Sequence, residues 1–253
     1  QVIKHFQQLS YLVPNLNYVA SDSRARYFQI RGIGERSGYQ GTPNSSVGFL
    51  IDDIDYSGQG GVATLFDVDQ VEVFRGPQGS RTGANALAGL IYIKTKDPTD
   101  NFEGTSELTL GDYGTHNIGI AFGGPMKNKK IKYRLVLRTD YSDGFRENTF
   151  LNKKDTSKKD ELTFRYKLDW DIDSSTKIKF LVSQVDIDDP ADIWTIDGSL
   201  NTLSDRPGMD SQKTDTYGVK IFKDYQNFDL QSYTSSTKTD VVFSYDADWG
   251  NKD

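Results

Sequence analysis

The stretch Asp67-Val-Asp-Gln-Val-Glu-Val-Phe-Arg-Gly-Pro-Gln-Gly-Ser-Arg-Thr-Gly-Ala-Asn-Ala-Leu-Ala-Gly-Leu-Ile-Tyr-Ile-Lys-Thr-Lys-Asp-Pro98 decides the fold. Two β-prone runs, residues 68–74 and 90–95, flank a segment rich in glycine with one proline. Glycine permits positive φ and close backbone approach, and proline fixes a corner. The pattern therefore predicts a compact unit of strands joined by tight turns, with structural glycines at Gly32, Gly76, Gly79, Gly83 and Gly89.

Charged residues occur inside or beside these apolar runs. Glu72 lies between Val71 and Val73, and Arg75 follows Phe74 directly. Upstream, the run Phe28-Gln-Ile-Arg-Gly-Ile-Gly34 carries Arg31 in the same setting. A charge in an apolar setting is tolerated only when it is paired. We therefore expect Arg31, Glu72 and Arg75 to belong to a charge cluster.

These segments resemble a known family. Residues 28–34, Val47-Gly-Phe-Leu-Ile-Asp-Asp-Ile54 and residues 67–98 are similar, in order, to the plug domain of TonB-dependent outer-membrane receptors. The family pattern is Ile-Arg-Gly, then Val-x-Asp-Gly-Val, then Ile-Glu-Val-x-Arg-Gly-Pro-x-Gly, and a close on Gly-Gly-x-Ile-x-x-x-Thr-Lys-x-Pro. This chain departs from the pattern in three places, which are Asp52-Asp53-Ile54 for Asp-Gly-Val, Arg81-Thr82-Gly83 for Leu-Tyr-Gly, and Ala88-Gly89 for Gly-Gly.

Composition excludes several classes. The 253 residues carry a net charge of −6, which argues against a nucleic-acid partner because phosphate binding needs a basic face. No cysteine is present, so disulfides, thiolate catalysis and Cys-ligated metals are excluded. No apolar run approaches the length of a membrane helix. The chain begins at Gln1 without a signal peptide, which leads us to expect a trimmed region or an internal fragment. An apolar periodicity over residues 1–17 predicts a short amphipathic helix that stops at Pro14.

After Pro98 the chain changes to alternating strands. In residues 131–141 and 161–172, apolar residues alternate with polar ones, and we expect strands at 104–111, 115–123, 131–141, 161–172, 176–186, 215–223, 227–237 and 239–247. Such alternation suits either a soluble sandwich or a membrane barrel. Strand lengths near ten residues, aromatic residues at strand ends and connections that alternate between short and long favour the barrel. The short turns are expected near 125–130, 173–175 and 225–227, and the long loops near 142–159 and 188–213.

The resemblance adds a fold and a function. It implies a mixed α/β plug domain over residues 1–98, followed over residues 99–253 by antiparallel transmembrane strands that form part of a 22-stranded barrel. It implies uptake of a scarce ligand, most often a ferric siderophore that carries the iron, across the outer membrane of a Gram-negative bacterium. The implied partners are outer-membrane lipid and the energy-transducing TonB complex, which would engage a segment upstream of Gln1. The charge cluster would then be shared with the barrel wall.

Two loops are candidates for ligand contact. Residues 36–46 and 56–61 are rich in glycine, serine and other turn formers and are expected to be exposed connections. If the resemblance holds, loops at these positions form the plug apex. The contact candidates are Arg36, Tyr39, Gln40, Gln59 and Phe66.

Other chemistry finds little support. The glycines at 32, 34 and 38 miss the spacing of a dinucleotide fingerprint. The two histidines, His5 and His116, are far apart, and the acidic run over 186–192 lacks the order of an EF-hand, so no metal site is predicted. No nucleophile and base can be assembled, so we expect neither an enzyme nor a cofactor. Receptors for oligosaccharide, cobalamin or haem share the plug and stay open as alternatives, as do a passive porin or adhesin barrel and a soluble carbohydrate-binding β-sandwich.

Overall fold

The computed structural model describes residues 6–20, 24–37, 44–59, 62, 64–83 and 85–251. The chain divides into two compact units, Gln1–Lys96 and Asp97–Asp253. Within the described ranges, none of the helices has the length and apolar character needed to span a membrane.

The first unit is built mainly from short strands. Its elements are the 3-10 helix η1 (Phe6–Tyr11), β1 (Leu16–Ala20), β2 (Ala25–Ile30), β3 (Val47–Ile51), β4 (Ile54–Asp55), β5 (Val68–Arg75), α1 (Gly79–Thr82) and β6 (Gly89–Thr95). The strands β1 and β2 form an antiparallel pair. The other four form a mixed sheet in the order β4-β3-β6-β5, in which β3 and β6 run parallel.

The two parallel strands of this sheet are its most buried part. Both β3 and β6 are nearly continuous apolar runs, as expected for strands covered on both faces. Leu50 and Leu90 pack with Ala86, which is fully buried. A second cluster is aromatic, since the rings of Phe6, Phe28 and Phe49 lie with centroids 4.7–5.8 Å apart. Burying these apolar side chains stabilises the unit.

Helix content in this unit is lower than predicted. The helix expected over residues 1–17 is, in its described part, a 3-10 helix of six residues, and α1 has four residues. The described part of the unit is therefore mostly β rather than the mixed α/β fold that we expected. Gly79 is the first residue of α1, and Gly83 follows its last residue at φ 67°, which ends the helix after four residues.

At two positions within residues 67–98, the backbone favours glycine over any other residue. Gly76 directly follows β5 and has φ 106°, a backbone conformation that residues other than glycine rarely adopt. Gly89 begins β6, where a Cβ atom would overlap the carbonyl oxygen of Phe74 and the side chain of Ile30. The strands β5 and β6 can pair through Arg75 and Gly89 because no side chain intervenes.

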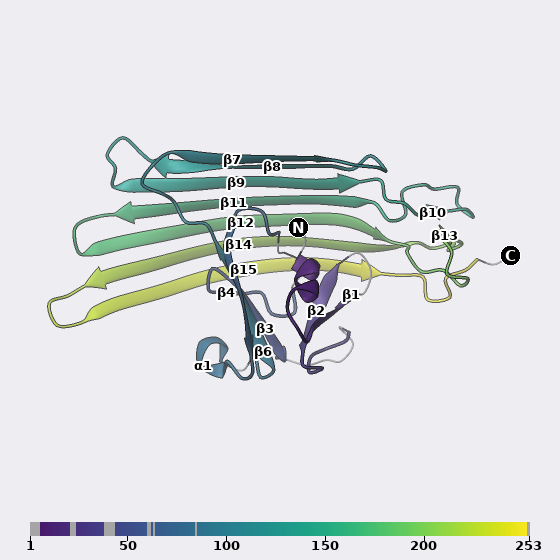
Figure 1. Cartoon of the computed structure of the whole chain (residues 1–253), viewed down its shortest axis with the longest axis horizontal. Coiled ribbons are helices and arrows are strands. Elements are labelled where there is room, and N and C mark those ends of the chain that lie inside the picture. The colour runs from purple at the N-terminus through teal and green to yellow at the C-terminus, as the bar shows by residue number, and fades with distance from the viewer. Residues whose placement is uncertain are drawn as a thin grey trace. The chain divides into compact units, whose positions relative to one another are not determined.

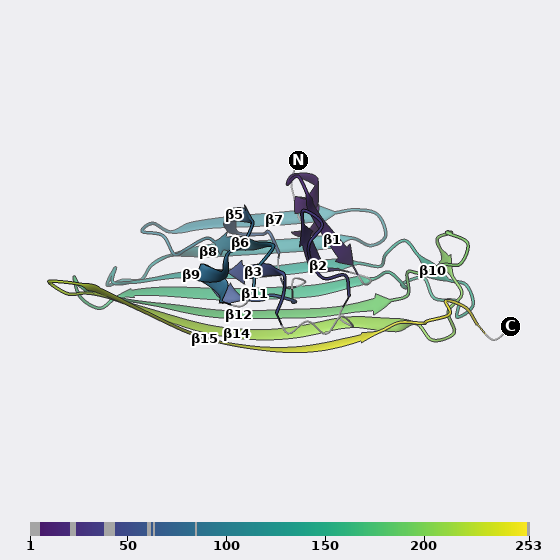
Figure 2. The ribbon, with the colours of Figure 1, turned by 90° about the horizontal axis from the view of Figure 1, so that it is seen from below.

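The second unit is one antiparallel sheet of seven strands (Figures 1 and 2). Its order is β15-β14-β12-β11-β9-β8-β7. Among these seven strands, neighbours in the sheet are therefore also consecutive along the chain, which is a meander. The strands are β7 (Glu103–Leu110), β8 (His116–Pro125), β9 (Ile131–Ser142), β11 (Lys159–Asp171), β12 (Thr176–Ala191), β14 (Gly208–Asp224) and β15 (Asp229–Ser244). Tight turns of a few residues separate β8 from β9, β11 from β12 and β14 from β15, near the predicted positions.

The prediction was wrong for the last strands. Residues 227–237 and 239–247 were expected as two strands, but β15 runs unbroken over Asp229–Ser244. The run around Lys238 contains serine and aspartate but no glycine, proline or asparagine, and it stays extended and paired with β14. The loop predicted near 142–159 is confirmed, since β9 ends at Ser142 and β11 begins at Lys159. The loop predicted near 188–213 is shorter, because β12 extends to Ala191 and β14 begins at Gly208.

The two faces of this sheet differ in character. The registers place Leu137, Phe164, Val182 and Tyr217 on one face, with the side chains between them on the other. We call the first the apolar face and the second the polar face. Large side chains on the apolar face are well exposed, for example Ile118 at 44% and Tyr217 at 58%. Charged residues of the polar face are buried, and they include Arg134, Arg138, Asp140, Arg165, Lys167, Asp169 and Asp210.

Candidate functional site

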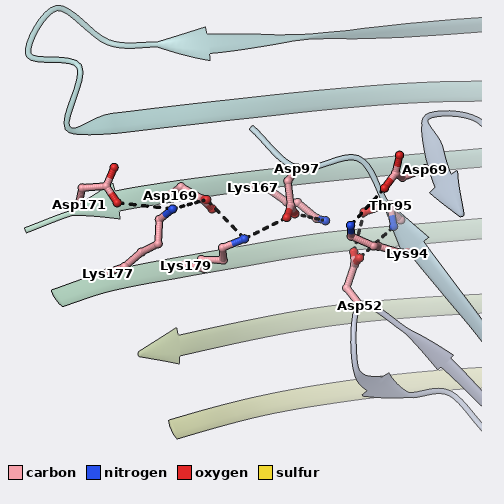
Figure 3. A network of polar contacts seen from close by, with 10 residues as sticks. All are labelled: Asp52, Asp69, Lys94, Thr95, Asp97, Lys167, Asp169, Asp171, Lys177 and Lys179. Carbon is pink, nitrogen blue, oxygen red and sulfur yellow. Dashed lines mark hydrogen bonds and ion pairs between the residues drawn. The ribbon is translucent and has the colours of Figure 1, made fainter. Parts of the chain in front are cut away.

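In the first unit, a tight turn is bonded to the last strand. Asp52 and Asp53 join β3 to β4 with φ of 51° and 71°, and both lie in the left-handed region. Aspartate tolerates this region better than most residues, which explains how it replaces the family's glycine here. One carboxylate oxygen of Asp52 accepts the backbone N–H of Thr95 at 2.9 Å, and the other accepts its hydroxyl at 2.6 Å. Asp52 therefore fixes the end of β6, just before the chain leaves the unit (Figure 3).

The neighbouring strand contributes an ion pair at the same end. Lys94 Nζ lies 3.2 Å from Asp69, across the β5–β6 pair. Both side chains are about half exposed, so the pair contributes little on its own. The buried hydrogen bonds of Thr95, which is 1% exposed, carry more of the stability of this end of the unit.

The second unit begins with a carboxylate held by two lysines. Asp97 accepts a hydrogen bond from Lys167 Nζ at 3.0 Å and another from Lys179 Nζ at 2.9 Å (Figure 3). Lys167 belongs to β11 and Lys179 to β12, which are adjacent interior strands. Partial burial opposes ionisation of Asp97, but the two ammonium groups outweigh it and lower the pKa of this carboxyl to about 2.

The ion pairs continue along the polar face beyond Asp97. Lys179 also lies 3.5 Å from Asp169, and Lys177 lies 3.6 Å from the same carboxylate and 3.5 Å from Asp171 (Figure 3). Each charge in the row thus lies within 4 Å of an opposite charge. Such a row satisfies charges that would be costly to bury alone.

A second group of charges occupies β7 and β9. Arg138 donates to both carboxylate oxygens of Asp140, at 2.8–3.1 Å, and to Glu107 at 2.7 Å. Arg134 donates to Glu103 at 2.8 Å. Bidentate arginine–carboxylate contacts are strong and directional. The polar face thus carries two groups of charge-assisted contacts.

The two longer loops of the sheet are bonded together. Short strands β10 (Glu147–Asn148) and β13 (Asn201–Thr202) pair in parallel. The amide of Asn148, which is fully buried, donates to Asp192 at 2.9 Å and to the carbonyl of Ser204 at 2.8 Å. Its oxygen accepts the N–H of Leu151 at 2.8 Å. We call this set the loop junction, and it makes the two loops one structural piece.

The predicted charge cluster is not formed within the first unit. Arg31 lies in a turn with φ 55° and is exposed, as is Arg75 at the end of β5. Glu72 is half buried and accepts a hydrogen bond from Gln70 at 2.7 Å. Among the residues of this unit that the structure describes, no ion pair joins the three. Pairing with the barrel wall stays a prediction.

The predicted ligand-contact residues are only partly described. Tyr39 and Gln40 lie outside the described residues. Arg36 is exposed and Gln59 half buried, whereas Phe66 is buried at 9% exposure. Of the predicted structural glycines, Gly32 and Gly83 also adopt positive φ, and Gly79 begins α1.

Sequence reasoning missed Asp97 and the loop junction. The partners of Asp97 lie 70 and 82 residues away, so no local pattern could reveal them. A signal existed in the alternation of β11, where Lys167 and Asp169 occupy positions opposite to the apolar residues. In the described ranges, no three carboxylate or histidine side chains come together as a metal site, and His5 is not among the residues described.

A β-rich unit with glycine-jointed strands, followed by a sheet whose exposed face is apolar, defines the class. Residues 3–90, about a third of the chain, match the family model described as "TonB-dependent Receptor Plug Domain".

Individual relatives agree with this class. The chain is 25% identical over 158 residues to the vitamin B12 transporter of Vibrio vulnificus, a match that covers 57% of this chain and 26% of that protein. It is 27% identical over 114 residues to the ferripyoverdine receptor of Pseudomonas aeruginosa, covering 45% and 13%. The solved ferric yersiniabactin uptake receptor of Yersinia pestis superimposes with a TM-score of 0.82 at 20% identity, covering 95% of this chain and 39% of that one. The chain thus spans well under half of the length of these relatives.

Proposed function

We propose that this chain is the plug and the first wall strands of an outer-membrane receptor that imports a scarce ligand, a ferric siderophore, with energy supplied through TonB. The observation that carries the proposal is the distribution of side chains on the sheet of the second unit, which exposes its apolar face and buries its polar face. A sheet that exposes Ile118, Ile120 and Tyr217 while burying Arg134 and Arg138 suits hydrocarbon on one side and a polar interior on the other.

The finer parts of the proposal follow from the family. The plug domain would span residues 1–98, and the wall would continue in strands beyond the seven seen here toward a total of 22. A lumen of that width needs a plug. Polar contacts suit a plug that must move, because they can exchange with water during opening. Arg31, Glu72 and Arg75 are proposed to pair with the wall.

The ligand is proposed from relatives and from the apex loops. Relatives named for ferric siderophore uptake support iron, and Arg36, Tyr39, Gln40, Gln59 and Phe66 are the proposed contacts. The similarity to a vitamin B12 transporter favours cobalamin as the second candidate. Neither proposal requires a resident cofactor or a catalytic group.

Uptake measurements test the proposal. The full-length receptor would be deleted from its host, and cells starved of iron would be given iron-55 siderophores or labelled cobalamin. We expect the deletion to abolish TonB-dependent uptake of one ligand class and a plasmid copy to restore it. Uptake that persists without TonB would indicate a passive porin, and a protein that stays soluble without detergent would indicate the β-sandwich.

A further inference from the structure

Segments of the first unit that lie far apart in the sequence meet where its two parallel strands begin. Strands β3 and β6 start side by side, so the chain that enters one strand lies next to the chain that enters the other. The backbone N–H of Ala86 donates to the carbonyl of Ser45 at 3.0 Å. The N–H of Ala88 donates to the carbonyl of Ser46 at 2.8 Å. Residues 85–88 and 44–46 are therefore held together before the sheet begins.

A third segment, residues 55–58, runs back along β3 toward the same place. The hydroxyl of Ser57 accepts the backbone N–H of Phe49 at 3.0 Å. Gly58 then lies beside Ser45, because a Cβ atom placed on this glycine would be 3.4 Å from the Ser45 hydroxyl oxygen. The three segments therefore converge at the beginning of β3.

The side chain of Asn85 bonds to both of the other segments. Its amide oxygen accepts the backbone N–H of Ser45 at 3.1 Å, and its amide nitrogen donates to Asp55 at 2.9 Å. The other carboxylate oxygen of Asp55 accepts the N–H of Ser57 at 2.8 Å. Because a backbone N–H can only donate and an ionised carboxylate can only accept, the amide has a single orientation that satisfies both partners. Asn85 therefore fixes the two segments relative to each other.

A buried carboxylate adds a bond between the two described ends of the loop 36–46. Glu35, which directly precedes this loop, is 8% exposed. One of its carboxylate oxygens accepts the N–H of Ser46 at 2.8 Å and the hydroxyl of the same residue at 2.6 Å. Arg36 is thus attached to a residue that is bonded at the beginning of β3. We call the set that makes these contacts the loop frame, and its members are Glu35, Ser45, Ser46, Asp55, Ser57 and Asn85.

We propose that Asn85 is a positioning residue for ligand binding, which holds residues 44–46 and 56–59 in one arrangement through the loop frame. This inference rests on the proposed function, in which the loops to which these residues belong carry Arg36 and Gln59 as ligand contacts. A ligand that touches both loops binds more tightly when they are already in place, because less conformational freedom is lost on binding. Asn85 acts on the ligand only through the two loops that it joins.

Exchanging the two bonded side chains tests the loop frame. Asn85→Asp places one carboxylate against another and breaks the bond to Asp55, because like charges repel and neither group can donate. Adding Asp55→Asn restores the bond with donor and acceptor reversed, and the amide oxygen at position 55 can still accept the N–H of Ser57. We expect backbone amides in residues 44–46 and 56–59 to exchange about tenfold faster in Asn85→Asp, the effect of about one hydrogen bond. In the double variant, exchange should return to the wild-type rate.

Uptake by cells provides the second measurement. The probes are the iron-55 siderophores and the labelled cobalamin that test the proposed function. In Asn85→Asp, the probe concentration that gives half-maximal uptake should rise about tenfold, and the maximal rate per receptor should stay unchanged. The double variant should restore the wild-type concentration. A residue that only stabilises the fold would instead lower the amount of receptor and leave the half-maximal concentration unchanged.

Gln70→Glu is the matched control. The amide of Gln70 donates to Glu72 at 2.7 Å within β5, so this variant also places a carboxylate against a carboxylate. Both residues belong to one strand and join no loops, and we therefore expect wild-type exchange in residues 44–46 and 56–59 and wild-type uptake.

The outcomes that would overturn the inference are distinguishable from a failure of the proposed function. If exchange in Asn85→Asp equals that of wild type, or if the double variant does not restore it, the loop frame is refuted. If exchange behaves as expected but the half-maximal concentration is unchanged, Asn85 does not position the ligand contacts, and the proposed function stands. If wild-type cells take up none of the probes, the proposed function fails and the ligand role of Asn85 fails with it.

Discussion

Replacing Asp52 by alanine should loosen the end of the plug unit from which the chain departs. The carboxylate is the acceptor for both the N–H and the hydroxyl of Thr95, and Thr95 is 1% exposed. A buried donor without its acceptor costs about 1 to 3 kcal/mol. Alanine at φ 51° adds about 1 kcal/mol, because the left-handed region disfavours a Cβ that cannot bond locally.

The expected loss is therefore about 3 kcal/mol, which corresponds to a roughly 150-fold more frequent opening of β6. Hydrogen exchange of the backbone amides of β6 reports this opening directly. The matched control is Asp53→Ala in the same turn. Asp53 is exposed at φ 71°, so this variant incurs the backbone cost without removing the bonds to Thr95. Exchange in β6 that accelerates equally in both variants would refute the role assigned to the Asp52 carboxylate.

Three further outcomes are expected. The pKa of Asp97 is lowered in the folded protein, so the contribution of this carboxylate to stability is present above pH 3.8 and is lost as the pH falls toward 2. The shift corresponds to about 2.4 kcal/mol, which solvent screening reduces to about 1 kcal/mol because 41% of the side chain is exposed. Hydrogen exchange of the backbone amides of residues 97–102 across this pH range measures the loss. Arg138→Ala leaves the buried carboxylate of Asp140 without its arginine and should lower the free energy of urea unfolding by about 3 to 5 kcal/mol, whereas Lys238→Ala, at a side chain 77% exposed, should change it by less than about 0.5 kcal/mol. Asn148→Ala should lower the free energy of unfolding by about 2 to 3 kcal/mol and make both longer loops sensitive to protease together. Cleavage of one loop alone would contradict the role of the loop junction.

Much of the fold could be predicted because the sequence patterns of its strands and turns are local. Alternation in residues 131–141 and 161–172 predicted β9 and β11 to within two residues at each end. The turns near 125–130 and 173–175 were placed by their proline, asparagine, aspartate and serine residues. The error at β15 arose from breaking the run at Lys238, where neither glycine nor proline occurs and the chain stays paired with β14.

The polar contacts could not be read in the same way. Asn148 looks like an ordinary loop residue, yet it is fully buried because its three partners come from residues 151, 192 and 204. Asp97 looks like one residue of a solvated Lys-Asp-Pro turn, and only the strand register brings it together with Lys167 and Lys179. Hydrophobic periodicity fixes which face a side chain occupies, but it does not identify the partner across the sheet.

The loop junction has an evolutionary consequence. Because Asn148 belongs to one long connection and Asp192 and Ser204 to the other, neither connection can diverge freely while its companion stays the same. A graft that exchanges one of them between homologues should fail unless the second is transplanted with it. Lineages of such proteins would then inherit the two segments as a pair.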